Sequence, residues 1–328
     1  MSIEIFEPSI EPETDGRQLV TFFLISYNQE RFIREALEGA FAQTYQPLEI
    51  VLSDDCSPDR TFEIMRQVVT EYKGPHRVVL SRNERNLGLC GNVNRVLDLA
   101  SGEIVVIAAG DDISSPDRVE KSWRILEENP DANCVSFQIK TIDGDGVQSP
   151  NEKTTHGPLE KYSLDDFIDR NGFNHNGASR AFRKSVYDYF GPLSVKAATE
   201  DSTTLLRCLM LGAACYSHDL VIYYRVHGGN YYASDKKHSI KYKRIYWQYL
   251  TDIALALKRG QVSNSDAGCL KGVLRRRLKE NILSTDYYLS DSKVGYFYRK
   301  ILYSKVFGAR EKLTYFIRTI KSLMGTLK

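Results

Sequence analysis

The stretch LVTFFLISYNQERFIREALEGAFAQTYQPLEIVLSDDCS, residues 19–57, carries two apolar runs with a helical pattern between them. Residues 19–26 and 48–53 are short and rich in β-forming side chains, which is typical of buried strands. Between them, the apolar side chains of residues 31–43 recur every three or four positions, which predicts a helix with one buried face. The stretch therefore predicts a strand–helix–strand unit.

The same alternation continues on the C-terminal side of this unit. Strands that alternate with helices of about 10–15 residues indicate βαβ units, and continuously apolar strands indicate a sheet covered on both faces. The predicted fold is therefore α/β, with a mostly parallel central sheet and helices on both faces. Further strands are expected at 77–81, 104–109 and 134–142, and helices at 59–72, 92–100 and 118–128.

The rest of the chain divides into a leader, an irregular stretch and a helical end. Residues 1–17 show no periodicity and are expected to form a mobile leader. We expect one α/β domain over residues 18–235, followed by a helical, basic C-terminal region over residues 236–328. Within the domain, loops are expected at 143–175, a short strand at 176–182, strand structure at 214–226, and helices at 184–190 and 201–211.

The composition excludes several classes of protein. With 42% hydrophobic and 26% charged residues among 328, the chain resembles neither a disordered nor a collagen-like protein. Its six cysteines have no CxxC spacing, so reduced thiols are expected rather than a zinc site or a disulfide framework. The longest apolar run, 104–109, is too short for a membrane-spanning helix, and the acidic N-terminus does not resemble a secretory signal.

Charge is distributed unevenly along the chain. Residues 236–328 contain 21 Lys and Arg against 6 Asp and Glu, a net charge of +15, whereas residues 1–235 carry a net charge of −13. This pattern indicates an anionic partner, such as a membrane or a nucleic acid, or docking of the basic end on the acidic body. Helical spacing of apolar residues near the C-terminus favours an interfacial helix. These residues are Leu313, Phe316, Ile317, Ile320, Leu323, Met324 and Leu327.

Polar residues follow three of the predicted strands. Tyr27 follows the first strand, Asp54 and Asp55 end the second, and Asp111 and Asp112 follow the strand at 104–109. Ligands of parallel α/β sheets bind beyond the carboxyl ends of the strands, so these residues are candidates for one site.

Each of these features has a structural and a functional interpretation. Adjacent carboxylates after an apolar strand are unfavourable unless a cation neutralises them, and Mg²⁺ binds through one or two carboxylates and substrate phosphates. Alternatively, residues 111–115 form a turn in which Ser114 or Ser115 caps the next helix. Residues 54–57 can likewise be a strand-end turn, and Tyr27 a solvated aromatic residue.

Taken together and in order, these motifs resemble those of the family 2 glycosyltransferases, which have the GT-A fold. The resemblance extends over roughly residues 19–230 and includes the rhythm of strands and helices. Its motifs are SYN at 26–28, QTY at 43–45, DDCS at 54–57, NLG at 86–88, ASGE at 100–103 and DD at 111–112.

The resemblance implies a role for each of these residues. Tyr27 would stack on the nucleobase of a nucleotide-sugar, Asp55 would hydrogen-bond that base, and Asp54 would support the loop. Asp111 would contact the ribose. Asp112 would bind the Mg²⁺ or Mn²⁺ ion that bridges the diphosphate.

Two later motifs complete the predicted site. Asp201 follows Glu200 at the start of a predicted helix and matches the family's catalytic base, although acids at this position also stabilise a helix without any chemistry. The sequence YRVH at 224–227 matches a late family pattern of aromatic-Arg-x-His. There His227 would contact the metal or the diphosphate, and Arg225 the donor, unless the histidine is structural.

The leading hypothesis is an inverting, metal-dependent glycosyltransferase that takes a nucleotide-sugar donor and acts in surface-polysaccharide synthesis. Its acceptor would be a glycan or a lipid-linked glycan. The basic end would contact the cytoplasmic face of the inner membrane or form a homo-oligomer, and no nucleic-acid motif is visible. The alternatives are a sugar-phosphate nucleotidyltransferase, which would need a Gly-rich loop that residues 26–32 lack, and a non-catalytic glycan-binding module.

Overall fold

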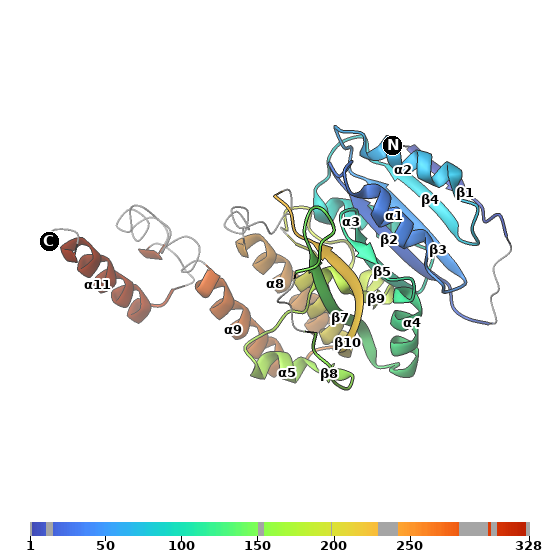
Figure 1. The fold of residues 1–328 in the computed structure, drawn as a ribbon. Helices are drawn as coiled ribbons and strands as arrows, with labels where there is room; N and C mark the ends of the chain where they lie inside the picture. The colour runs from blue at the N-terminus through green and yellow to red at the C-terminus, as the bar shows by residue number, and fades with distance from the viewer. Residues whose placement is uncertain are drawn as a thin grey trace.

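The computed structural model describes residues 2–10, 16–149, 154–197, 199–228, 242–281, 301–302 and 307–325. Figure 1 shows the strands gathered in one sheet and the last helices beyond it. The strands are β1 (Ser2–Phe6), β2 (Val20–Ser26), β3 (Leu48–Asp54), β4 (Arg77–Arg82), β5 (Ile104–Ala109), β6 (Ile113–Ser114), β7 (Ala132–Ile142), β8 (Glu160–Tyr162), β9 (Ala181–Arg183) and β10 (Ala213–Arg225). The helices are α1 (Ile33–Phe41), α2 (Thr61–Glu71), α3 (Leu89–Leu99), α4 (Arg118–Glu128), α5 (Leu164–Asp169), the 3₁₀ turn η1 (Gly177–Ser179), α6 (Ser185–Phe190), α7 (Asp201–Leu211), α8 (Tyr242–Lys258), α9 (Asn264–Asn281) and α11 (Ala309–Gly325).

The sheet has the order β1-β4-β3-β2-β5-β9-β7-β10-β6, and β8 pairs with the start of β10. Strands β4, β3, β2 and β5 are parallel to one another, as are β7 and β10, whereas β9 runs antiparallel between β5 and β7. The predicted α/β fold with a mostly parallel centre is confirmed. All residues of β2 and β3 are buried, which explains why these strands are continuously apolar.

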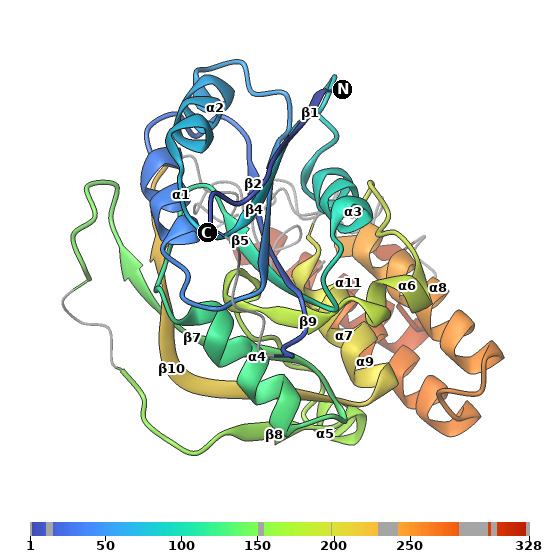
Figure 2. The same ribbon diagram turned by 90° about the vertical axis from the view of Figure 1, so that its right-hand side faces the viewer.

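Helices cover both faces of the sheet, as Figure 2 shows. Alternate side chains of β2 point to opposite faces, so Phe22 and Leu24 pack with residues of α1, α2 and α4. Phe23 and Ile25 pack on the other face with residues of α3, α6 and α7. Two hydrophobic layers therefore hold the carboxyl ends of the parallel strands in place.

Four local predictions are wrong. The stretch 143–175, which is predicted to form loops, contains strand β8 and helix α5, because β8 pairs with the start of β10 and Ser163 caps α5. Part of the predicted leader is a strand, because β1 pairs antiparallel with β4 and covers the edge of the sheet. The segment predicted as a strand at 176–182 begins instead as η1, and β9 starts at Ala181. The residue that precedes α4 is Asp117 rather than Ser114 or Ser115, and the Ser115 hydroxyl donates a hydrogen bond to its carboxylate.

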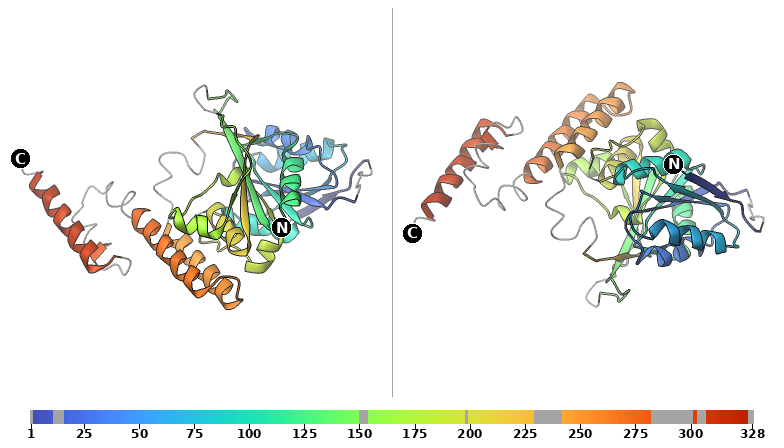
Figure 3. Two further views of the ribbon diagram at one scale, coloured as in Figure 1. Left: turned by 90° about the horizontal axis from the view of Figure 1, so that it is seen from below. Right: turned by 90° about the horizontal axis from the view of Figure 1, so that it is seen from above.

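The first two helices after residue 235 pack into the core of the sheet domain. Apolar residues of α8 and α9 belong to the same hydrophobic cluster as those of α3 and α7, and Figure 3 shows α8 and α9 side by side. The proposed domain boundary at residue 235 lies outside the described residues. Among the described residues, no helix is both long and apolar enough to cross a membrane.

A buried ion pair joins α7 to α8. The Arg207 guanidinium donates two hydrogen bonds to the Asp252 carboxylate, at 2.8 and 3.0 Å, and both side chains are 3% exposed. Gln248 donates a further hydrogen bond to Asp252 at 2.8 Å. Each charge is thus compensated in a place that water does not reach.

We expect Asp252→Ala to lower the free energy of unfolding by about 3–5 kcal/mol, because the substitution leaves the Arg207 charge buried without its partner. Urea unfolding followed by circular dichroism measures the change. The double variant Arg207→Met/Asp252→Leu should recover most of the loss, since it removes both charges. Equal stability of wild type and Asp252→Ala would contradict this account of the α7–α8 junction.

Candidate active site

The site begins where β2, β3 and β5 end together. Because these strands are parallel and in register, Ser26 lies beside Asp54, and Ile25 lies beside Ala109. The chain leaving β3 stays at this edge, since the amide of Asp55 donates to the carbonyl of Ser26 at 2.9 Å. The residues that follow the three strands are thereby brought to one edge of the sheet, as the sequence predicted.

The acidic pair that follows β5 is hydrogen-bonded to the residues at the end of β10. The backbone amide of Arg225 donates to Asp112 Oδ1 at 2.9 Å, and Arg225 Nε donates to the carbonyl of Asp111 at 3.0 Å. His227 Nε2 lies 3.1 Å from Asp111 Oδ2. Residues more than 110 positions apart in sequence thus form one cluster.

Asp112 has the electrostatic character of a cation ligand. Burial, and then the neighbouring Asp111, raise the pKa of Asp112 well above its usual value. Its Oδ2 atom is buried and has no hydrogen-bond partner among the described residues. A bound cation would give this oxygen a partner and favour the charged carboxylate, so the residues fit a divalent metal ion.

The described residues do not form a complete metal cage. Nowhere among them do three His, Cys, Asp or Glu side chains converge as a set of metal ligands. Asp112, with His227 beside Asp111, would therefore supply only part of the coordination shell. A Mg²⁺ ion bound there would take its remaining ligands from substrate phosphates and water.

Arg225 has a mainly internal position. Its side chain is 1% exposed, and Nη2 donates to Glu35 of α1 at 2.7 Å. Its guanidinium also stacks on the Phe32 ring at 5.0 Å, and the His227 ring packs on the same phenylalanine at 4.5 Å. These contacts fasten the end of β10 to the start of α1 and hold His227 beside the acidic pair.

The acids at the end of β3 have different partners. Asp54 is fully buried and accepts hydrogen bonds from the backbone amide (3.0 Å) and the hydroxyl of Ser57, so it shapes the loop. Asp55 accepts from Asn83 Nδ2 at 2.8 Å, from the amide of Leu87 at 2.8 Å and from that of Gly88 at 2.9 Å. The carboxylate of Asp55 thus organises the NLG turn of residues 86–88.

Tyr27 lies at the open side of the same edge. Its side chain is 48% exposed, in contrast to the fully buried phenylalanines of the preceding strand. An exposed aromatic ring at this edge of the sheet offers a flat apolar surface to a planar ligand.

The predicted base begins α7 and is held by an asparagine. Asp201 Oδ1 accepts from the amide of Ser202 at 2.6 Å, and Oδ2 accepts from Asn174 Nδ2 at 3.0 Å. The preceding residue, Glu200, is partly buried, and desolvation and then the charge of Asp201 raise its pKa to about 7. The carboxylate of Asp201 is therefore oriented by two hydrogen-bond donors, the Ser202 amide and the Asn174 side chain.

Sequence reasoning missed the residues that hold Asp201. The buried Arg180 guanidinium donates to the carbonyl of Asp201 and, at 3.0 Å, to that of His175, so it ties the start of α7 to the preceding loop. Gly177 permits the close approach, because a Cβ there would lie 2.2 Å from Asp201 Cβ. The sequence predicts only the end of a loop and the start of a strand for the segment NHNG at 174–177, and the glycine is the one sign of a close approach there.

We expect Gly177→Ala to reduce turnover by about 10- to 100-fold, because the added methyl group must displace Asp201 and a shift of about 1 Å can have such an effect. The steady-state rate of donor consumption measures the change. Gly268→Ala on α9 is the matched control, since nothing lies within 4 Å of its added Cβ. If the two variants have equal activity, the close packing of Gly177 does not position Asp201.

Tyr224 connects the two halves of the site. Burial, together with the negative charges of Asp112, Asp111 and Asp201, raises its pKa to about 12. Because side chains alternate along a strand, Tyr224 leaves β10 on the face opposite that of Arg225. The charges of the acidic pair and of the acid at the start of α7 thus all act on the pKa of this one side chain.

The mixed α/β sheet, with an acidic pair at its parallel edge and a further acid at a helix start, matches the GT-A fold of solved glycosyltransferases. The family model described as Glycosyl transferase family 2 matches residues 21–191. The chain belongs to this family, and the family resemblance inferred from the sequence is confirmed.

Relatives share part of their length with the chain. An uncharacterized protein of Mycobacterium tuberculosis is 35% identical over 126 residues, which are 38% of this chain and 36% of that protein. TuaG of Bacillus subtilis, named as a teichuronic acid biosynthesis glycosyltransferase, is 29% identical over 156 residues, which are 47% of this chain and 59% of that protein. The alignments thus cover less than two thirds of either relative.

Solved structures share the fold. TarS from S. aureus, in a complex with UDP-GlcNAc, superposes with a TM-score of 0.60 at 18% identity, over 86% of this chain and 76% of that chain. The mannosyltransferase PcManGT from Pyrobaculum calidifontis, in a complex with GDP-Man and Mn²⁺, gives 0.51 at 18% identity, over 85% of this chain and 75% of that chain.

Proposed function

We propose that this protein transfers a sugar from a nucleotide-diphosphate sugar to an acceptor hydroxyl, with inversion at the anomeric carbon. One observation carries the proposal. Asp112 is buried beside Asp111 with an oxygen that lacks a hydrogen-bond partner among the described residues, and the charges of Asp112, Asp111 and Asp201 all help to raise the pKa of Tyr224. A cation site for a diphosphate and a base for a hydroxyl would thus flank one space.

The donor would bind along the edge of the parallel strands. Tyr27 would stack on the base, and the loop shaped by Asp54 and Asp55 would hydrogen-bond it. Asp111 would contact the ribose. The Asp55 carboxylate already accepts hydrogen bonds from within the chain, including two from the turn at 86–88. We therefore infer that this turn, and not the Asp55 carboxylate alone, would present hydrogen-bonding groups to the base.

Asp112 and His227 would hold a divalent ion, Mg²⁺ or Mn²⁺, on the diphosphate. The ion, when bound, neutralises negative charge on the leaving nucleoside diphosphate. The presence of Mn²⁺ with GDP-Man in PcManGT supports this choice.

Asp201 would act as the general base. It takes the proton of the acceptor hydroxyl while that oxygen forms a bond to the anomeric carbon, and the bond from this carbon to the diphosphate breaks. The nucleoside diphosphate leaves with the electron pair. Because the acceptor attacks the face opposite the leaving group, the configuration inverts. Asn174 and the Ser202 amide would keep the carboxylate oriented, which is the main requirement for a base of this kind.

The biological setting we propose is surface-polysaccharide synthesis, with a glycan or a lipid-linked glycan as the acceptor, at the cytoplasmic face of the inner membrane. The name of TuaG as a teichuronic acid biosynthesis enzyme supports this setting. UDP-GlcNAc in TarS and GDP-Man in PcManGT mark the range of donors to test.

The test is a panel of nucleotide-sugars incubated with the full chain and Mn²⁺ or Mg²⁺, with release of the nucleoside diphosphate as the signal. Asp201→Asn is the negative control, and NMR of the product's anomeric proton reports inversion or retention. A nucleotidyltransferase would instead release pyrophosphate from a nucleoside triphosphate and a sugar phosphate. Binding of a glycan without turnover of any donor would favour a binding module and overturn the proposal.

A further inference from the structure

Helix α11 lies apart from the sheet domain. In Figures 1 and 3 it lies beyond α9, at the end of the molecule farthest from β1. Helices α8 and α9, in contrast, contribute apolar residues to the main hydrophobic cluster. Within the described part of the basic C-terminal region, α8 and α9 are thus built into the core, and α11 is not.

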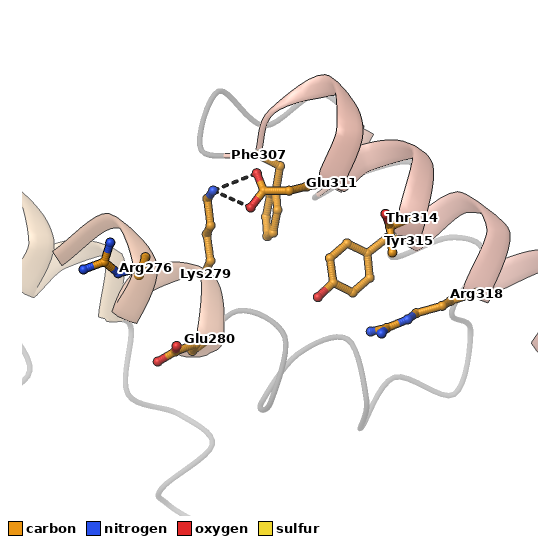
Figure 4. A pocket seen from close by; sticks show the side chains of 8 residues that line it. All are labelled: Arg276, Lys279, Glu280, Phe307, Glu311, Thr314, Tyr315 and Arg318. Carbon is orange, nitrogen blue, oxygen red and sulfur yellow. Dashed lines mark hydrogen bonds and ion pairs between the residues drawn. The ribbon is translucent and has the colours of Figure 1, made fainter. Parts of the chain in front are cut away.

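The polar side of α11 faces α9. Lys279 Nζ at the end of α9 pairs with both carboxylate oxygens of Glu311, at 2.6 and 2.7 Å. Figure 4 shows these side chains around a pocket at the junction. The pocket is lined from α9 by Arg276, Lys279 and Glu280, and from the other side by Phe307, Glu311, Thr314, Tyr315 and Arg318.

The opposite side of α11 exposes aliphatic side chains. Leu313, Ile317 and Ile320 are 57%, 46% and 39% exposed. At about 3.6 residues per turn, their spacing places them in one stripe, and Glu311 and Tyr315 lie roughly across the helix from that stripe. An amphipathic helix of a globular protein normally turns its apolar side to the core, whereas α11 turns its polar side that way.

The charges beside the stripe indicate what covers it. Arg310 and Lys312 lie on either side of the stripe by the same helical repeat, and the chain from residue 236 onward has a net charge of +15. Aliphatic residues bordered by cations match the boundary between acyl chains and anionic headgroups, where a helix lies parallel to the surface. A symmetric contact between the α11 helices of two copies would bring this positive charge against itself.

We propose that α11 binds the surface of an anionic phospholipid bilayer through the stripe formed by Leu313, Ile317 and Ile320. The cations beside the stripe attract the headgroups, and the aliphatic side chains enter the interface. The catalytic domain is thereby held at the membrane through the junction with α9. This inference does not depend on the proposed sugar chemistry.

The test is flotation of the full chain with vesicles of phosphatidylcholine mixed with phosphatidylglycerol. Wild type should float with these vesicles, less so at high salt, and much less with pure phosphatidylcholine. Ile317→Glu should weaken binding by at least about tenfold, because a charge replaces an inserted side chain. Leu159→Glu is the matched control, since Leu159 is a 40% exposed aliphatic residue outside α11.

A second pair of variants tests the charges. Arg310→Gln should weaken binding to the anionic vesicles by about fivefold, as expected for one cation near the surface. Arg124→Gln, at an exposed position of α4, should not change it. Donor turnover in the absence of vesicles should be the same for all four variants.

Three results would overturn the proposal. One is equal flotation of Ile317→Glu and wild type. Another is no flotation of the wild type at low salt. The third is sedimentation of the wild type as a dimer that Ile317→Glu dissociates without any effect on vesicle binding, which would assign the stripe to a second copy.

Discussion

Asp112→Asn is expected to reduce sugar transfer by about 10³-fold or more, because several kcal/mol of stabilisation of the leaving diphosphate would be lost with the cation. Asparagine keeps the size of the side chain and an acceptor for the Arg225 amide, so the fold should persist. The apo variant should unfold at the same temperature as wild type or higher, since burial and Asp111 disfavour the charged form of Asp112. Nucleotide release and thermal unfolding, measured in parallel, test both expectations.

Two controls make this result specific. Asp117→Asn, at the residue before α4, changes an acid in the same way at a position that contacts Ser115 and Lys121, and it should leave activity unchanged. Excess chelator should reduce wild-type activity to the level of Asp112→Asn. Full wild-type activity in chelator would show that no divalent ion is required and that the assignment of Asp112 is wrong.

Asp201→Asn is expected to lower kcat by about 10²- to 10⁴-fold, which is the usual contribution of a general base, and to leave donor KM nearly unchanged. The amide cannot take the proton of the acceptor hydroxyl, although it can still accept the hydrogen bond of the Ser202 amide. Initial rates over a range of donor concentrations at saturating acceptor separate the two constants.

The competing explanation of Asp201 is purely structural, because an acid in the first turn of a helix contributes about 0.3–1 kcal/mol of stability. Asp165→Asn, in the first turn of α5, is the control for that effect. Both variants should lose similar small amounts of stability, and only Asp201→Asn should lose turnover. If donor KM rises while kcat at saturation is retained, Asp201 belongs to donor binding instead.

The strands at the centre of the sheet could be located from the sequence alone. Strands β2, β3 and β5 are buried on both faces, and such strands must be continuously apolar, which is a signal that local sequence carries. The acidic pair at 111–112 could also be located, because the end of an apolar strand in a parallel sheet marks the ligand edge. Strand β1 escaped detection because it is short, half exposed and depends on pairing with β4.

The sequence by itself determined the α/β class, the strand ends that carry acids and the chemistry those acids offer. Only the tertiary structure decided which residues meet there. Asn174 donates a hydrogen bond to Asp201, 27 positions later in the sequence, and the Arg225 amide donates to Asp112, 113 positions earlier. The apolar stripe of α11 is exposed and does not face the sheet domain. These contacts depend on how the elements pack in three dimensions. A hydrogen bond between two elements requires that both be placed correctly, and a helix face is exposed only where no other element covers it. Periodicity in the sequence describes the faces of a single element and does not say what packs against them.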